Sequence, residues 1–298
     1  MALKRGSKSK GTLPSPGGVV ALLLVVAVLF LGGAFPLHAL LGEGGLILAQ
    51  ILFLAVPPLV YVAVRRHDPV RTFSLRLPTP RATLGGVLLI AAGTPLAWFL
   101  AWLQGQFLPI PVEYLEAMAE MLTADSIPRY LWLLLMVAVT PAICEEILFR
   151  GAILAGLRNG LPVVVAVILS GLVFGLFHLS PQTGFRILPT AWLGILLAWA
   201  VVASGSLPLA VLLHFLNNGA ILTLAAIPVT RELVSSAEEA PPLLLLPVAL
   251  IVLAVALRLL GMPEKPGALP HGSGRARPTE GLPGPSEGAE GSGDRPGS

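Results

Sequence analysis

The sequence predicts an all-α fold, a polytopic transmembrane bundle of about eight membrane helices with a disordered C-terminal tail, and three observations support this prediction. Hydrophobic residues form 55% of the 298 positions and charged residues only 12%, whereas soluble domains carry about 25% charged residues. The apolar residues fall into several runs of about 18 to 25, each long enough to cross about 30 Å of hydrocarbon as a helix. The chain ends in a segment rich in Pro, Gly, Ser and Glu, which has too little apolar surface to fold.

The apolar runs define the predicted helices in order along the chain. We expect helices at 18–41, 44–64, 82–103, 130–158, 162–180, 187–203, 206–227 and 241–261. The first run follows a basic segment, as in a signal peptide, but it continues toward Leu41 without a small-residue cleavage motif, so we interpret it as a membrane helix. The chain then divides into a basic cytoplasmic N-terminus at 1–17, one membrane domain at 18–261 and a disordered tail at 262–298.

Loop charges predict the orientation of the bundle. An even number of helices places both termini on one side, and Lys and Arg accumulate on the cytoplasmic side. Such residues precede the first helix and fill the loop after the second: Lys4, Arg5, Lys8, Lys10, Arg65, Arg66, Arg71, Arg76 and Arg81. Acidic residues dominate the opposite loops, where 111–121 fits either a short interfacial helix or a polar loop. We therefore expect an integral, multi-pass protein with both termini in the cytoplasm.

Composition also limits the partners and the setting. The formal charge of +3 would fit nucleic-acid binding, but the basic residues stand beside apolar runs without aromatic interleaving, so no nucleic acid is expected. The only cysteine, Cys144, lies inside an apolar run, which excludes a disulfide framework. A composition rich in Ala, Leu, Gly, Pro and Arg is typical of a GC-rich bacterial genome, so we expect a bacterial cytoplasmic membrane. No oligomeric state is predicted.

A few ionisable and amide side chains interrupt the predicted membrane helices. An ionisable residue at mid-bilayer costs about 2.5–3.5 kcal/mol on insertion scales, so each is a candidate functional residue. The set comprises Glu145, Glu146, Arg150, His178, His214, Asn217 and Asn218.

Glu145 and Glu146 are adjacent, and their positions relative to Arg150 predict a different role for each. Residues four apart share a helix face, so Glu146 and Arg150 are predicted to form a structural ion pair. Glu145 points about 100° away and has no partner within its helix. A buried, unpaired carboxylate can accept and return a proton, as a general base does. Pro141, one turn before it, removes a backbone hydrogen bond and predicts a kink.

The two histidines have both a structural and a catalytic interpretation. His178 follows Phe174 by one helical turn, and a lone helical histidine is more often a packing residue than a catalyst. His214 and Asn218 are also four apart and can donate hydrogen bonds to one oxygen, although interhelical hydrogen bonding is an equal alternative. Together, however, a carboxylate base, a second proton-handling group and paired donors are what hydrolysis by activated water requires.

Three short motifs here are similar to the signatures of a known family. The segments C-E-E-I-L-F-R, F-G-L-F-H and H-F-L-N-N resemble E-E-x-x-x-R, F-x-x-x-H and H-x-x-x-N of the CAAX-protease and bacteriocin-processing membrane peptidases. Each motif alone is weak, but all three occur in the family's order, each on a predicted membrane helix, within 141–219. The resemblance implies a membrane-embedded protease of the CAAX type that hydrolyses a peptide bond of a membrane-associated protein or peptide.

The resemblance also implies roles for these residues. Glu145 and His178 would activate the attacking water, and His214 with Asn218 would bind the carbonyl oxygen as charge develops. The predicted ion pair would support the site. Prenylated substrates are not carried over, because no residue pattern marks a prenyl pocket.

The family is often labelled as metalloproteases, which raises the question of a metal. Glu145, His178 and His214 could supply nitrogen and oxygen ligands to zinc or another divalent cation. No H-E-x-x-H pair stands on one helix, and we favour activation by the glutamate without a cofactor.

Two other functions fit the same residues. In a proton-coupled transporter they would form a proton relay, and in a non-catalytic scaffold or immunity factor they would serve folding alone. One count disfavours the catalytic interpretation: measured from the predicted helix starts, Glu145 lies toward the cytoplasmic half and His178 toward the opposite half. A long, tilted or kinked fourth helix is therefore expected if they meet.

Overall fold

The structure is a computed structural model that describes residues 12–109, 113, 117, 120–179, 186–226 and 241–261. The chain divides into two compact units, Met1–Pro266 and Gly267–Ser298, and all described residues lie in the first. The predicted tail at 262–298 lies outside the described residues, as does most of the predicted interfacial segment at 111–121.

All eight predicted helices are present, and each boundary lies within a few residues of its expected position, except that the last helix begins five residues later. The first three are α1 (Pro16–Leu41), a second helix made of α2 (Glu43–Ala49), η1 (Gln50–Ala55) and α3 (Val56–Val64), and α5 (Pro80–Gly105). The fourth comprises α7 (Ile127–Leu134), η2 (Leu135–Val139), α8 (Thr140–Glu146), η3 (Ile147–Ile153) and α9 (Leu154–Arg158). The remaining helices are α10 (Val163–Phe177), α11 (Ile187–Ser204), α12 (Leu207–Ala226) and α14 (Leu246–Leu260), and the short α4 (Pro69–Thr72) follows α3.

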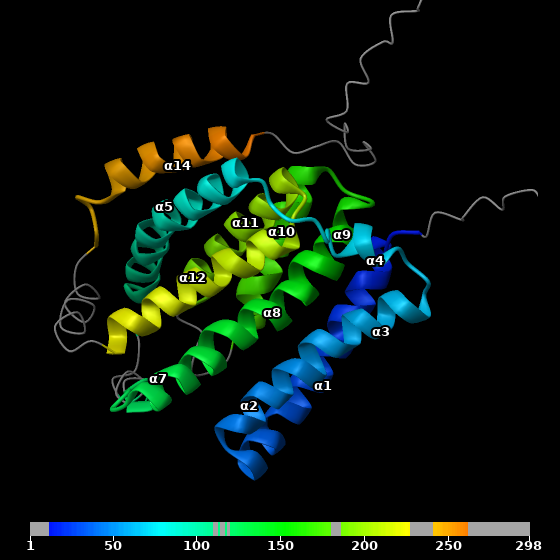
Figure 1. Cartoon of the computed structure of the whole chain (residues 1–298), viewed down its shortest axis with the longest axis horizontal. Coiled ribbons are helices and arrows are strands. Elements are labelled where there is room, and N and C mark those ends of the chain that lie inside the picture. Colours follow the sequence, from blue (N-terminus) through cyan, green and yellow to red (C-terminus); the bar gives the residue numbers. More distant parts are fainter. Residues whose placement is uncertain are drawn as a thin grey trace, which may run out of the picture. The chain divides into compact units, whose positions relative to one another are not determined.

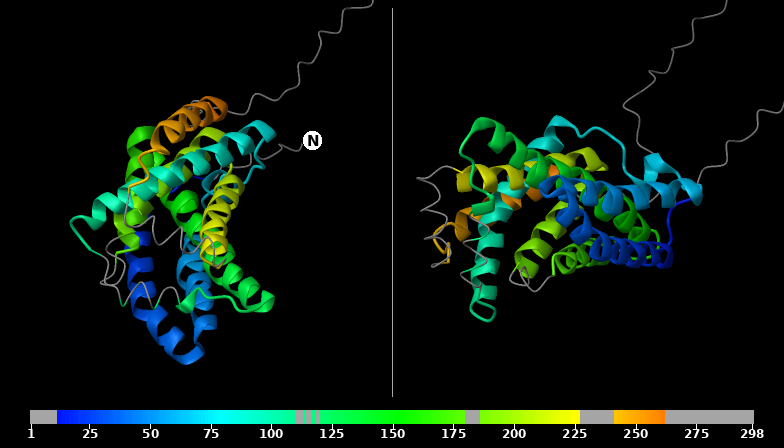
Figure 2. Two further views of the ribbon diagram at one scale, coloured as in Figure 1. Left: turned by 90° about the vertical axis from the view of Figure 1, so that its left-hand side faces the viewer. Right: turned by 90° about the horizontal axis from the view of Figure 1, so that it is seen from below.

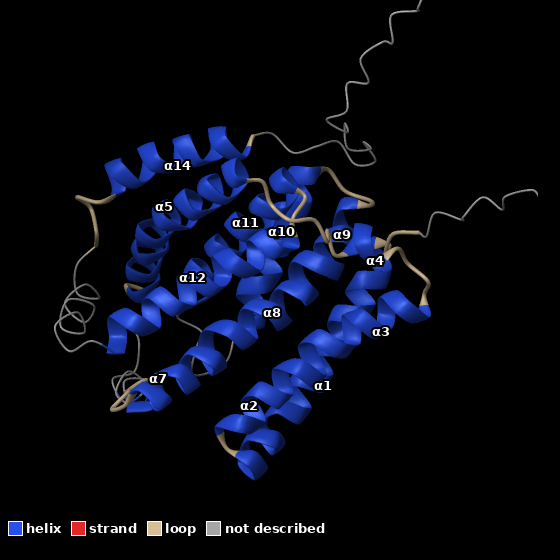
Figure 3. Cartoon of the chain, viewed as in Figure 1, coloured by secondary structure: helices blue, strands red, loops and turns tan. Residues whose placement is uncertain are grey.

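The predicted all-α class is confirmed for the described residues, which contain helices and loops and no strand (Figure 3). Six of the helices are long and apolar enough to cross a membrane, which makes this an integral, multi-pass membrane protein. The other two apolar helices, α10 and α14, have 15 residues each. A helix of that length rises only about 22 Å, less than the hydrocarbon thickness. Because α10 is this short, its C-terminal end does not reach the far side of the membrane, and the candidate site lies at that end.

Polar residues beside prolines set several helix starts. The side chains of Ser15, Thr79 and Ser126 each accept a hydrogen bond from the backbone N–H three residues later. A proline follows each cap at the first or second helical position, where its missing N–H is not needed. The apolar runs therefore begin where the local sequence can satisfy the free end of a helix.

The helices pack as neighbouring pairs (Figures 1 and 2). α14 lies along α5, α10 lies along α11, and α12 contacts both η2 and α8. The N-terminal pair of helices contacts the fourth helix through α1, η1 and α3. The fourth helix thus has neighbours on several sides, as its buried residues require.

Loops that were predicted to be cytoplasmic gather at one end of the bundle. Asp68 N donates to Thr12 O at 3.0 Å, and Asn159 Nδ2 donates to Pro14 O at 2.9 Å. Further contacts at this end include Ser206 Oγ to Arg76 O and Arg81 Nη2 to Arg258 O. This clustering is what an even number of helices requires, while the direction of the bundle in the membrane stays a prediction.

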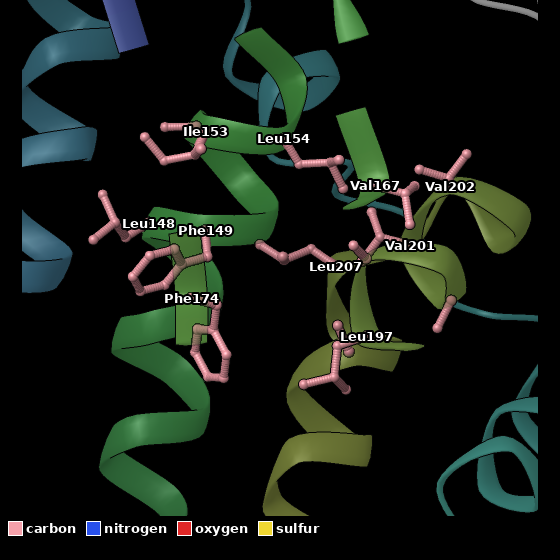
Figure 4. Close-up of a cluster of buried hydrophobic side chains, with 14 of the residues drawn as sticks. Leu148, Phe149, Ile153, Leu154, Val167, Phe174, Leu197, Val201, Val202 and Leu207 are labelled. Atoms are coloured by element: carbon pink, nitrogen blue, oxygen red, sulfur yellow. The ribbon is translucent and has the colours of Figure 1, made fainter. Parts of the chain in front are cut away.

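The apolar core surrounds the middle of the fourth helix. Leu148 and Phe149 pack with Phe174 of α10 and Leu197 and Val201 of α11 (Figure 4). The rings of Phe149 and Phe174 meet edge to face with centroids 5.0 Å apart. This core holds α10 and α11 against the helix that carries the acidic motif.

Small residues allow α10 and α11 to approach closely, as the small-xxx-small spacing of Gly171 and Gly175 suggests. A Cβ atom added to Gly171 would lie 2.6 Å from the backbone nitrogen of Ile195 and 2.9 Å from the carbonyl oxygen of Ala191. On α11, a Cβ at Gly194 would lie 3.0 Å from the Cα of Gly171. Backbone atoms cannot move aside as a flexible side chain can.

We therefore predict that Gly171→Ala lowers the stability of the protein by about 1–3 kcal/mol through overpacking. The matched control is Gly32→Ala on the exposed face of α1, where an added Cβ meets nothing within 4 Å. That change should be neutral or slightly stabilising, because Ala is the better helix former. Thermal unfolding in detergent compares the two, and equal midpoints for both variants would contradict the close packing of α10 on α11.

Candidate active site

A buried carboxylate lies at the centre of the candidate site. Arg150 Nη1 donates to Glu146 Oε1 at 2.7 Å, and both side chains are fully buried, so the predicted ion pair is confirmed. His214 of α12 places its Nδ1 2.8 Å from the same oxygen. Spacing within one helix gave no sign of this third member, because it comes from a helix nearly 70 residues further along the chain.

The guanidinium group of Arg150 also reaches two other helices. Its Nη2 donates to the carbonyl oxygen of Gly194 in α11 at 3.1 Å, and its Cζ lies 4.1 Å from the ring centroid of Phe174 in α10. The second contact is a cation–π interaction, which gains strength where water is absent. Arg150 therefore joins the fourth helix to α10 and α11, and Glu146 joins it to α12.

Phe174 brings the two histidines into the same neighbourhood. Its ring centroid lies 4.8 Å from the ring of His178 and 6.0 Å from the ring of His214. His178 is the residue directly after α10, and its Nδ1 lies 2.8 Å from the carbonyl oxygen of Phe174. Because a carbonyl only accepts, this Nδ1 carries a proton, and in the neutral ring Nε2 is then an acceptor.

Glu145 faces His178, as the resemblance implies. Its Oε2 lies 4.0 Å from His178 Nε2, and the two side chains are 14% and 33% exposed respectively. This carboxylate oxygen is buried and has no hydrogen-bond partner. The distance exceeds that of a direct hydrogen bond and is within the span that one bridging water covers.

The expectation that Glu145 and His178 lie in opposite halves of the membrane is wrong. Both are better measured from the loop at 159–162 that joins their helices. Glu145 stands 13 residues before Arg158 and His178 stands 15 residues after Val163, which correspond to rises of about 20 and 22 Å. The two residues are therefore level, because α10 ends well before it could cross the membrane.

The backbone on both sides of the acidic motif is π-helical. The segment η2 ends at Val139, just before Pro141, and η3 begins at Ile147, directly after Glu146. Such irregularity is expected where a proline interrupts a helix, and π segments recur at functional sites. The motif thus occupies a short α-helical stretch between two widened turns.

Asn218 has partners that the sequence did not indicate. Its Nδ2 donates to the backbone carbonyl of Val137 at 3.0 Å, and its Oδ1 accepts from Asn217 Nδ2 at 3.1 Å. Thr94 Oγ1 of α5 lies 3.5 Å from Asn217 Oδ1. Asn217 is thus hydrogen-bonded to Asn218, although neighbouring residues on a helix differ in direction by about 100°. The amide nitrogen of Asn218 carries two hydrogens, so one remains for a ligand.

The proposed metal ligands are not assembled as a metal site. Within the described ranges, no three His, Cys, Asp or Glu side chains lie close enough together to hold a metal ion. Glu145, His178 and His214 therefore do not form such a group, and His214 uses Nδ1 to contact Glu146.

Comparison with known proteins confirms the resemblance. Residues 127–220 match a family described as type II CAAX prenyl endopeptidase, Rce1-like. The match extends from α7 to the middle of α12 and includes all three motifs. A search of curated proteins and one of solved structures found no match.

The buried pair predicts a large loss of stability when Glu146 is neutralised. Glu146→Gln leaves the Arg150 guanidinium buried without its counter-charge, which should cost about 3–5 kcal/mol. The matched control is Glu43→Gln, which breaks an ion pair with Arg129 whose side chains are 30% and 29% exposed. Such partly exposed pairs contribute little. Thermal unfolding should separate the two variants. A Glu146→Gln protein as stable as the control would show that the buried contacts of Glu146 with Arg150 and His214 do not hold the fold.

Proposed function

We propose, on the premise that residues 127–220 are of the type II CAAX endopeptidase kind, that this protein hydrolyses a peptide bond of a membrane-associated protein or peptide within the bilayer. The observation that carries the proposal is the buried, unpartnered carboxylate oxygen of Glu145 set 4.0 Å from His178 Nε2. A free carboxylate in a membrane helix is costly, and catalysis gives a reason for it.

Glu145 acts as the general base in this proposal, and His178 orients the water. The carboxylate removes a proton from a water held between Oε2 and the imidazole while the water oxygen attacks the substrate carbonyl. The same carboxyl group then returns the proton to the leaving amine as the peptide bond breaks. The hydrogen bond from His178 Nδ1 to Phe174 O places the proton of the neutral ring on Nδ1, so Nε2 is the nitrogen that can accept from the water.

His214 and Asn218 stabilise the oxyanion in this proposal. Glu146 fixes the imidazole of His214 through Nδ1, and in the doubly protonated ring Nε2 also donates. The remaining amide hydrogen of Asn218 is the second donor. Preorganised donors of this kind are effective because they already point at the oxyanion, so no reorganisation energy is needed when charge develops on it. Glu146 and Arg150 support the site by holding α8 and α12 together.

We predict that Glu145→Gln abolishes peptide hydrolysis while leaving thermal stability nearly unchanged. The substitution removes the proton-accepting oxygen, and that oxygen makes no hydrogen bond that folding would lose. Cleavage of detergent-solubilised peptides with a lipid anchor, followed by mass spectrometry, measures the effect.

Three results, from this cleavage assay, from liposomes and from cells, separate the alternative functions. Near-wild-type cleavage by the Glu145→Gln protein would refute its role as base. Absence of cleavage by wild-type protein, combined with proton flux in liposomes that Glu145→Gln removes, would favour a transporter. If the Glu145→Gln protein supports the function of the wild type in cells, and neither protein cleaves peptides, the result would favour a scaffold.

Asn218→Ala should lower kcat about 100- to 1000-fold, or about 2.7–4 kcal/mol, as loss of one oxyanion donor typically does. The KM should change little, because the interaction strengthens only as charge develops on the carbonyl oxygen. Steady-state kinetics on the same anchored peptides measure both constants. A defect confined to KM would leave helix packing as the better explanation of this residue.

A further inference from the structure

The carbonyl oxygen of Val137, in the π-helical segment η2, lacks the donor that an α-helix would give it. In a regular α-helix it would accept from the N–H of residue 141, but Pro141 has no N–H. A buried carbonyl without a donor is costly, and more so in a membrane. Asn218 of α12 supplies the donor through Nδ2 at 3.0 Å.

This contact determines which way the carboxamide of Asn218 faces. A backbone carbonyl can only accept, so the amide nitrogen and not Oδ1 must face Val137. The Oδ1 atom accepts from Asn217 Nδ2 at 3.1 Å, and Asn217 itself is buried. Two anchors at opposite ends of one planar group fix its plane, whereas one anchor would leave it free to pivot. The direction of the second amide hydrogen is therefore fixed as well.

We propose that Asn217 is a positioning residue, which orients the Asn218 carboxamide for the reaction while the carbonyl freed by Pro141 anchors the other end. This inference rests on the proposed function, because it is the remaining hydrogen of Asn218 that donates to the oxyanion. Asn217 touches neither the substrate nor the attacking water. It acts through Asn218 alone.

The alternative is that Asn217 only fills space between α12 and α5, where Thr94 lies 3.5 Å from its Oδ1. A packing residue and a positioning residue respond differently when Asn218 is absent. The packing contribution persists, whereas the positioning contribution disappears with the group that it positions. A double-mutant cycle measures this difference.

The experiment compares Asn217→Leu, Asn218→Ala and the double variant in kinetics on lipid-anchored peptides. Leu keeps the branched shape and the number of heavy atoms of the Asn side chain and removes the donor. Asn217→Leu should lower kcat about tenfold with KM unchanged, a coupling of the size that residues in contact show. In the Asn218→Ala background it should have no further effect on kcat. Leu216→Ala on the exposed face of α12 is the control and should leave both constants unchanged.

The outcomes distinguish this inference from the proposed function. Wild-type protein that cleaves no anchored peptide would overturn both. Wild-type cleavage combined with independent, multiplying losses in the two single variants, or with no loss in Asn217→Leu, would overturn only the positioning role. A loss confined to KM would also overturn it.

Pro141→Ala tests the other anchor, and its expected effects on stability and activity have opposite signs. Alanine restores an N–H that competes for Val137 O, and it is a far better helix former than proline. The melting temperature should stay the same or rise, while kcat falls, and the fall should be absent in the Asn218→Ala background. An unchanged kcat in Pro141→Ala, or the same loss in both backgrounds, would show that the freed carbonyl does not position Asn218.

Discussion

The buried carboxylate of Glu146 is the constraint on which the arrangement of the four site-forming helices depends. Taking a carboxylate and a guanidinium out of water costs several kcal/mol per ion, and the cost is offset only when geometry and hydrogen bonds are good. Arg150 and His214 meet the same carboxylate oxygen at 2.7 and 2.8 Å, and Arg150 also reaches Gly194 of α11. Contacts to these partners fix the fourth helix, α11 and α12 relative to one another, while Phe174 adds α10.

That arrangement explains why two adjacent acidic residues have different partners. Neighbours on a helix differ in direction by about 100°, so when Glu146 faces Arg150 and His214, Glu145 must face elsewhere. It faces His178, which α10 delivers at the same depth because that helix ends at Phe177. The glycines of α10 and α11 let these two helices approach closely enough for Arg150 to reach the Gly194 carbonyl. Packing, charge and the position of the unpartnered carboxylate are thus parts of one arrangement.

Spacing in the sequence predicted interactions within a helix, whereas the contacts of Glu146 and Asn218 with other helices could not be predicted from it. The apolar runs and the capped starts at Ser15 and Thr79 placed the helices, and spacing of four predicted the pair of Glu146 and Arg150. The bond from His214 to Glu146 depends on helix tilt and on the π-helical turns beside the motif, which shift the phase of side chains. Depth was misjudged for the same reason, since it depends on where each helix begins. One signal was available: a proline four residues after Val137 marks a carbonyl that has lost its α-helical donor.

We propose that this site hydrolyses peptide bonds with water activated by Glu145 beside His178. The most direct measurement is a single-turnover reaction of purified wild-type protein with lipid-anchored peptides in isotopically labelled water, followed by mass spectrometry of the products. Hydrolysis by activated water should give a new C-terminal carboxyl group that carries one labelled oxygen from the first turnover. Intact peptides after prolonged incubation with folded protein, or cleaved products without the label, would contradict it.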